Sequence, residues 1–118
     1  MPVRLTPLPD AEFEPIRARI EAGTADKTDL RAATKHLLAL LVEKAPGRSV
    51  EVRVPPYAAA QCIPGARHTR GTPPAVVEMD APTWIALALG DQVWAEAVRA
   101  GRITASGERS DLSAYLPV

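Results

Sequence analysis

The chain has 118 residues, the size of one small domain, and 47% of them are hydrophobic, which is ordinary for a globular protein. Its 14 Lys and Arg residues balance 14 Asp and Glu residues, so the formal net charge is zero. This balance argues against a nucleic-acid-binding protein, because nucleic-acid affinity draws on a surplus of positive charge. The aromatic content of 4% also excludes a platform of rings for stacking bases.

The cysteine content and the length of the apolar runs indicate the cellular compartment of the protein. The single cysteine, Cys62, excludes an intrachain disulfide and favours a reducing compartment. The longest strongly apolar run, Leu37 to Val42, is far shorter than the roughly 20 residues of a membrane span. The proline-rich start of the chain does not resemble a signal peptide. We therefore expect a cytoplasmic protein without stable membrane insertion.

The first 47 residues are predicted to form two helices. In the first, Phe13, Ile16 and Ile20 recur at helical spacing, Asp10 is the expected cap, and Gly23 ends the helix. The second helix is expected to start near Thr28 or Asp29 and to stop at Pro46-Gly47. Its expected apolar face comprises Leu30, Ala33, Leu37, Leu38, Leu41, Val42 and Ala45.

The middle of the chain is predicted to be extended. Residues 50–54 alternate β-branched and charged side chains, as a half-buried strand does, and two prolines end the run. A second strand is expected within residues 57–63 and a third over residues 75–79, with a polar loop between them.

The last forty residues are predicted to hold short elements. Asp80 is expected to cap a helix that reaches Leu89, and Asp91 to cap another that ends at Gly101. On that second helix, Val93, Trp94, Ala97 and Val98 are expected to face inward. A strand over residues 102–106 and a final helix, capped by Ser110 or Asp111, complete the prediction. Strands grouped between helices indicate one α+β domain over residues 1–118, with a helical part (1–47) and an α+β part (48–118).

Four consecutive stretches of the C-terminal half resemble the sterol carrier protein family. They are residues 76–80, 83–90, 94–101 and 102–107, which hold a strand, an acidic cap, two helices that each end in glycine, and a strand followed by Gly107-Glu108. Residues 55–62 and 68–74 are similar to a bacterial branch of that family. The resemblance implies a small, curved, mixed or antiparallel sheet with helices on one face and an apolar cavity between them. In this family the cavity takes sterols, fatty acyl chains or acyl-CoA, and the fold also occurs as an accessory domain of mycothiol-dependent isomerases.

Two sets of residues are candidates for a ligand site in such a fold. The predicted apolar lining is Trp84, Leu87, Trp94, Val98, Ile103, Leu112, Tyr115 and Leu116. Arg67, His68 and Arg70 form the densest positive cluster, and guanidinium groups suit a carboxylate or a phosphate. We expect this cluster at the polar end of the site; the alternative is an ion pair with Glu78 or Asp80.

The sequence offers little for catalysis or metal binding. Cys62 and His68 could act as nucleophile and base, but a lone cysteine is more often a small buried apolar residue. His36 and His68 lie far apart and lack metal-ligand spacing, so both are expected at the surface. We predict no catalytic residue, no metal and no cofactor.

These observations predict non-enzymatic binding of a hydrophobic small molecule or acyl chain in an internal cavity. One alternative is a relative of the isomerase accessory domain that acts with a separate enzyme. Another is a dimerisation module without a ligand, and a homodimer is also compatible with the first function.

Overall fold

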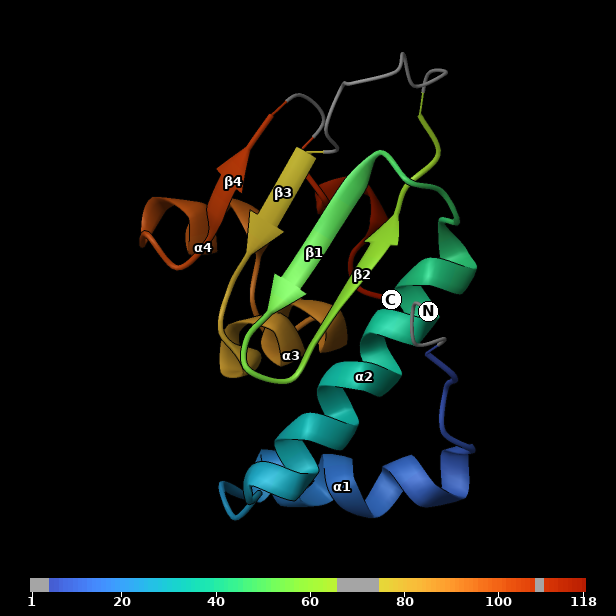
Figure 1. Ribbon diagram of the computed structural model, residues 1–118. Helices are drawn as coiled ribbons and strands as arrows, with labels where there is room; N and C mark the ends of the chain where they lie inside the picture. The colour runs from blue at the N-terminus through green and yellow to red at the C-terminus, as the bar shows by residue number, and fades with distance from the viewer. Residues whose placement is uncertain (1–4, 66–74, 108–109) are drawn as a thin grey trace.

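The computed structural model describes residues 5–65, 75–107 and 110–118. Its elements are α1 (Asp10–Ala22), α2 (Lys27–Lys44), β1 (Val50–Val54), β2 (Ala58–Cys62), β3 (Ala75–Glu78), α3 (Ala81–Leu89), α4 (Trp94–Arg99), β4 (Thr104–Ser106) and the 3₁₀ turn η1 (Ser113–Tyr115). Strands in the middle with helices on either side along the chain confirm the α+β class (Figure 1).

The four strands form one small mixed sheet in the order β2-β1-β3-β4. β1 pairs antiparallel with β2 and parallel with β3, and β3 pairs antiparallel with β4. In the central register Val52 lies between Ala60 and Val77. The mixed sheet expected from the resemblance is therefore present.

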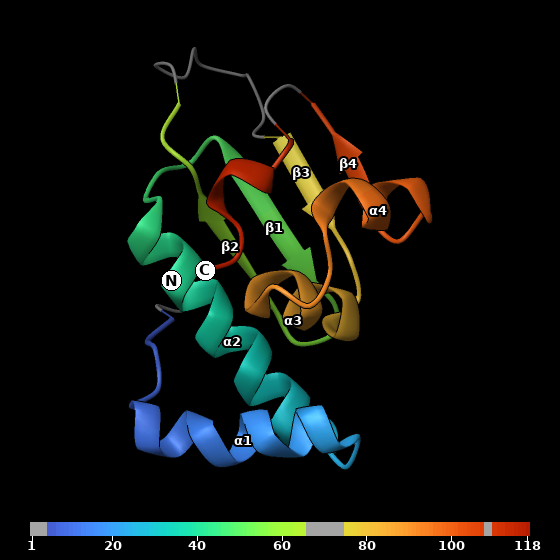
Figure 2. The same cartoon turned by 180° about the vertical axis from the view of Figure 1, so that it is seen from behind.

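The alternation along β1 separates the two faces of the sheet. Val50, Val52 and Val54 are completely buried, whereas Arg53 is exposed and Glu51 is half-buried on the opposite face. Figure 2 shows α2, α3 and the C-terminal residues on the side of the sheet that faces the viewer, while the strands face the viewer in Figure 1. The helices thus cover one face, as expected.

α2 is the long helix that joins the helical part to the sheet. It begins at Lys27, one or two residues earlier than predicted, because Asp26 is the cap: its side chain accepts from the backbone N–H of Asp29 at 2.9 Å, and its own N–H donates back to the Asp29 carboxylate. The predicted apolar face is confirmed at Ala33, Leu37, Leu38, Leu41 and Ala45, which are buried, while Leu30 and Val42 are half-buried.

Three predicted helix starts were wrong or shifted. Pro9 occupies the cap position of α1, so Asp10 begins that helix instead of capping it. Val93 precedes α4 as its cap residue, without a side-chain hydrogen bond, while Asp91 lies in the turn after α3, where its N–H donates to the carbonyl of Ala86 at 2.8 Å. The final helix is reduced to η1, in front of which Asp111 accepts from the N–H of Ser113 at 2.8 Å.

The shortness of α4 also overturns the predicted orientation of two valines. Trp94 and Ala97 are buried as expected, but Val93 is 59% exposed and Val98 is 47% exposed. A helix of six residues makes fewer than two turns, so it buries one narrow side only, and the two valines lie outside that side.

Candidate ligand-binding region

The last nine described residues, 110–118, cross the helical side of the sheet and are called the C-terminal segment below (Figure 2). The Lys44 ammonium of α2 donates to the backbone carbonyls of Tyr115 at 3.0 Å and Pro117 at 2.8 Å. The N–H of Val118 donates to the carbonyl of Ala88 in α3 at 3.0 Å. These contacts fasten the segment to both helices.

The layer that includes part of this segment is apolar and closely packed. Trp84, Leu87 and Leu112 are each at most 1% exposed and belong to one hydrophobic cluster with the inward valines of the sheet. The indole N–H of Trp84 donates to the backbone carbonyl of Thr34 in α2 at 3.3 Å. The hydroxyl of Thr34 is fully buried and has no hydrogen-bond partner among the residues that the structure describes.

Most of the predicted lining residues come together in this cluster. Trp94 is 9% exposed and belongs to it, and Ile103, Tyr115 and Leu116 are half-buried and pack against it. Val98 does not: its exposed position is a correction to the prediction that it faces the interior.

The predicted polar end lies outside the described residues. Arg67, His68 and Arg70 fall in residues 66–74, so their role as an anchor stays a prediction. Of the two acidic partners suggested for them, Glu78 is exposed, and Asp80 caps α3 by accepting from the N–H of Thr83 at 2.9 Å.

Two surface concavities lie away from the predicted lining. The first, of about 220 Å³, is lined by Asp80, Pro82, Thr83, Ala86, Gln92 and Arg102. The second, of about 320 Å³, is lined by Arg53, Pro55, Pro56, Tyr57, Ala58, Ala59 and Glu78. Neither includes a residue of the predicted apolar lining. Because Trp84 and Leu112 are fully buried, a ligand that contacts them needs neighbouring residues to move aside.

His36 is buried, which corrects the prediction of a surface histidine. It is 5% exposed, its ring centroid lies 4.1 Å from that of Phe13, and its Nδ1 accepts from the N–H of Leu8 at 2.9 Å. Burial lowers the pKa of His36, and the nearby Asp10 opposes this shift. The residue is a neutral packing and hydrogen-bonding group between α2 and the start of the chain.

Cys62 is the buried apolar residue that the sequence favoured. Its side chain is completely buried, and burial raises the pKa of the thiol to about 11. A nucleophile needs the thiolate, which this environment disfavours. Among the described residues, no three His, Cys, Asp or Glu side chains are grouped as a metal site requires, and no helix has the length and hydropathy to span a membrane.

Sequence reasoning missed the unpaired hydroxyl of Thr34. A signal was present, because Thr34 follows Leu30 by four positions and precedes Leu37 and Leu38 by three and four. Those intervals place it on the apolar face of α2. What the sequence could not show is which groups of other elements surround the hydroxyl.

Comparison with known protein families supports the resemblance noted above. The family model described as bacterial SCP ortholog matches residues 26–118, which takes in α2 as well as the sheet and leaves α1 outside. No curated protein matches the chain. The chain therefore belongs to the family of bacterial SCP orthologs, which are sterol carrier protein-like proteins.

Proposed function

We propose that this protein binds an apolar or acyl ligand without catalysing a reaction, in the layer between the sheet and the C-terminal segment. Membership of a sterol carrier protein-like family supports a lipid-binding role. The fully buried set formed by Trp84, Leu87 and Leu112 supplies apolar surface for a chain or ring system. The burial of Cys62 and its raised thiol pKa argue against a cysteine nucleophile, and a single cysteine suits the cytoplasm.

The C-terminal segment is the element best suited to move aside for a ligand. Its regular structure is one 3₁₀ turn, and beyond the fully buried Leu112 its apolar residues Tyr115, Leu116 and Val118 are only half-buried, so residues 113–118 are the part that can move. Segments with few buried contacts open at lower cost than the core strands. Displacing the segment would open a way to the indole of Trp84 and the side chain of Leu87.

The test combines retention of natural ligand with binding of a neutral apolar dye. Native mass spectrometry of protein purified without delipidation should show a bound apolar molecule. Nile red should bind with a blue-shifted emission, and Leu116→Asp should weaken its binding at least tenfold, because a carboxylate then enters the apolar layer. The matched control Val98→Asp, on the exposed side of α4, should bind normally. Absence of both natural ligand and dye binding, or equal loss in both variants, would refute the proposal.

Self-association is a second candidate function, favoured by the edge of the sheet. All three residues of β4 are exposed, and the strand carries no charged or proline residue of the kind that usually blocks pairing with another edge. The exposed Val93 and Val98 lie on or beside the neighbouring α4. A dimer in sedimentation equilibrium that Ala105→Pro dissociates would support this function, whereas a monomer at all concentrations would exclude it.

A further inference from the structure

The buried hydroxyl of Thr34 is unusual among the polar groups of this fold. Thr34 lies in the middle of α2 and has no exposed surface. Its Oγ1 has no hydrogen-bond partner within residues 5–65, 75–107 and 110–118. Because a buried hydroxyl without a partner destabilises a fold, nearly all such groups are paired, and an exception points to a partner that the described residues do not include, such as a bound water or a ligand.

The indole of Trp84 adds a second polar group at the same place. Its N–H reaches the Thr34 carbonyl at 3.3 Å, which is long for an N–H to O hydrogen bond. A carbonyl inside a helix also accepts from the N–H four residues further on, so the indole shares an acceptor already in use. The indole N–H of Trp84 is thus weakly bonded and contacts the backbone of the same residue whose hydroxyl lacks a described partner.

We propose that Thr34 and Trp84 anchor a single neutral oxygen, such as a hydroxyl or a carbonyl, carried by an otherwise apolar ligand. The inference rests on the proposed binding function and names the polar end of that site. The indole N–H would donate to the ligand oxygen, and the Thr34 hydroxyl would donate to it or accept from it. The ligand would then lie with its oxygen at α2 and its apolar body along Leu87 and the inward face of the sheet.

The charge of the surroundings selects a neutral ligand over an anionic one. The buried polar or charged residues in the described part of the chain are Asp29, Thr34, His36, Ser49 and Thr83, and none of them is Lys or Arg. His36, two positions from Thr34, uses Nδ1 to accept from the N–H of Leu8, and burial lowers its pKa, which favours the neutral ring. An ionised carboxylate at Thr34 would therefore lie in an apolar interior without a cationic partner, which is strongly unfavourable. The chemistry suits an alcohol, ketone or ester.

The experiment compares three probes that share one apolar chain length. Binding of 1-hexadecanol, hexadecane and palmitate is measured by native mass spectrometry and calorimetry at pH 7.5. The wild-type protein should bind hexadecanol at least tenfold more tightly than hexadecane or palmitate. Thr34→Val, which replaces the hydroxyl by a methyl of similar size, should remove the preference over hexadecane. Thr34→Ser should keep it. Thr28→Val, the same change at an exposed position of α2, should leave it unaltered.

The outcomes separate this inference from the proposed function. If no probe binds to the wild type, the proposed function fails and the anchor fails with it. If probes bind but Thr34→Val keeps the preference for hexadecanol, only the anchor is overturned. Tighter binding of palmitate would also overturn it and would favour the charged anchor predicted at Arg67 and Arg70.

Without ligand, Thr34→Val should melt at the wild-type temperature or higher. A variant that melts much lower or fails to fold would show that the hydroxyl has a structural partner, and would overturn the anchor too.

Discussion

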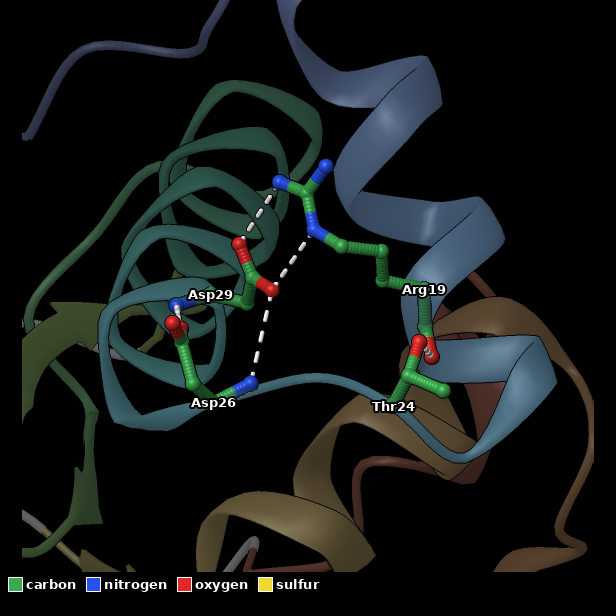
Figure 3. A network of polar contacts seen from close by, with 4 residues as sticks. All are labelled: Arg19, Thr24, Asp26 and Asp29. Carbon is green, nitrogen blue, oxygen red and sulfur yellow. Dashed lines mark hydrogen bonds and ion pairs between the residues drawn. The ribbon is translucent and has the colours of Figure 1, made fainter.

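Arg19 of α1 and Asp29 of α2 form an ion pair with two parallel hydrogen bonds, Nε to Oδ2 and Nη2 to Oδ1, both at 2.8 Å (Figure 3). The Asp29 side chain is 10% exposed and that of Arg19 is 47% exposed. Asp29 also accepts from the N–H of Asp26, so one carboxylate both completes the cap of α2 and holds α1. The ion pair and the cap together hold α1 against α2 beside the short connection between them, residues 23–26.

Replacing Arg19 by Met should lower the melting temperature at pH 7 by a few degrees. The hydrogen bonds from Arg19 hold the pKa of Asp29 below its usual value, against the opposing effect of burial. A lowered carboxyl pKa stabilises the fold above the usual value near 3.8, and this stability is lost as the pH falls through the lowered value. Arg19→Met should therefore raise the pKa of Asp29 in an NMR titration and narrow the difference between melting temperatures at pH 7 and pH 3.

The matched control is Arg17→Met on the same helix. Arg17 pairs with Glu21 at 3.1 Å, but both side chains are largely exposed, and such pairs contribute little to stability. This variant should melt close to the wild type. Equal melting temperatures for the two variants would contradict a structural role for the pair of Arg19 and Asp29.

Local patterns in the sequence predicted the elements whose cause is local. The alternation at Val50, Val52 and Val54 and the cap at Asp80 were sufficient for β1 and α3. The parallel pairing of β1 with β3 could not be predicted, because it depends on which strand edges meet after the chain has passed through β2. For the same reason, the burial of His36 escaped prediction: Phe13, which covers it, comes from another helix.

In the candidate site, too, local patterns predicted some features, and others depend on contacts between distant parts of the chain. The side chain of Trp84 faces the interior as predicted, because Asp80 and Gly90 mark the two ends of α3 in the sequence. Val98 was misplaced because periodicity was extended over a helix too short to sustain it. The tie from Lys44 to the C-terminal segment links residues 71 and 73 positions apart, and no local pattern contains it.

His36 should make the fold less stable in mild acid. Burial lowers its pKa, so the folded protein holds the proton less readily than the unfolded chain does. The stability that neutral His36 contributes is fully present above its usual pKa of 6.5. It is lost as the pH falls from that value through the lowered pKa of the folded protein. The melting temperature should drop between pH 7.5 and pH 5. His36→Gln keeps an acceptor for the N–H of Leu8 without titrating, and should flatten this drop. An equally steep drop in the variant would assign the effect to other groups that both proteins share.

Cys62 should react slowly with thiol reagents. Burial raises its pKa to about 11 and leaves the side chain with no exposed surface. At pH 8 the folded protein should be labelled by 5,5′-dithiobis(2-nitrobenzoate) at least a hundredfold more slowly than the same chain in denaturant. Labelling as fast as that of free cysteine would contradict the burial of Cys62.

Gly47 and Gly23 should respond very differently to alanine. A Cβ at Gly47 would overlap the carbonyl of Ile63, which already accepts from the N–H and hydroxyl of Ser49, and its φ is +156°. Gly23 also has a positive φ, of +75°, but a Cβ there meets nothing within 4 Å. Gly23→Ala should cost about 1 kcal/mol of unfolding free energy, and Gly47→Ala roughly 3 kcal/mol or more. Urea denaturation measures both, and similar costs would contradict the close approach at Gly47.

Lys44 should control how readily the C-terminal segment moves. Its ammonium makes two hydrogen bonds to carbonyls of the segment, and Lys44→Met removes both while keeping an apolar stem of similar length. The amides of Tyr115 and Val118, which donate to Leu112 and Ala88, should then exchange with solvent roughly tenfold faster, corresponding to about 1.4 kcal/mol. Exchange in β1 should not change, because local opening leaves the central strands closed.

Nile red should bind the variant at a higher rate if the segment covers the ligand-binding layer. Lys35→Met, at an exposed position of α2, is the control and should alter neither rate. Faster exchange without faster dye binding would mean that the segment opens but does not gate the site, and unchanged exchange would show that Lys44 does not hold it.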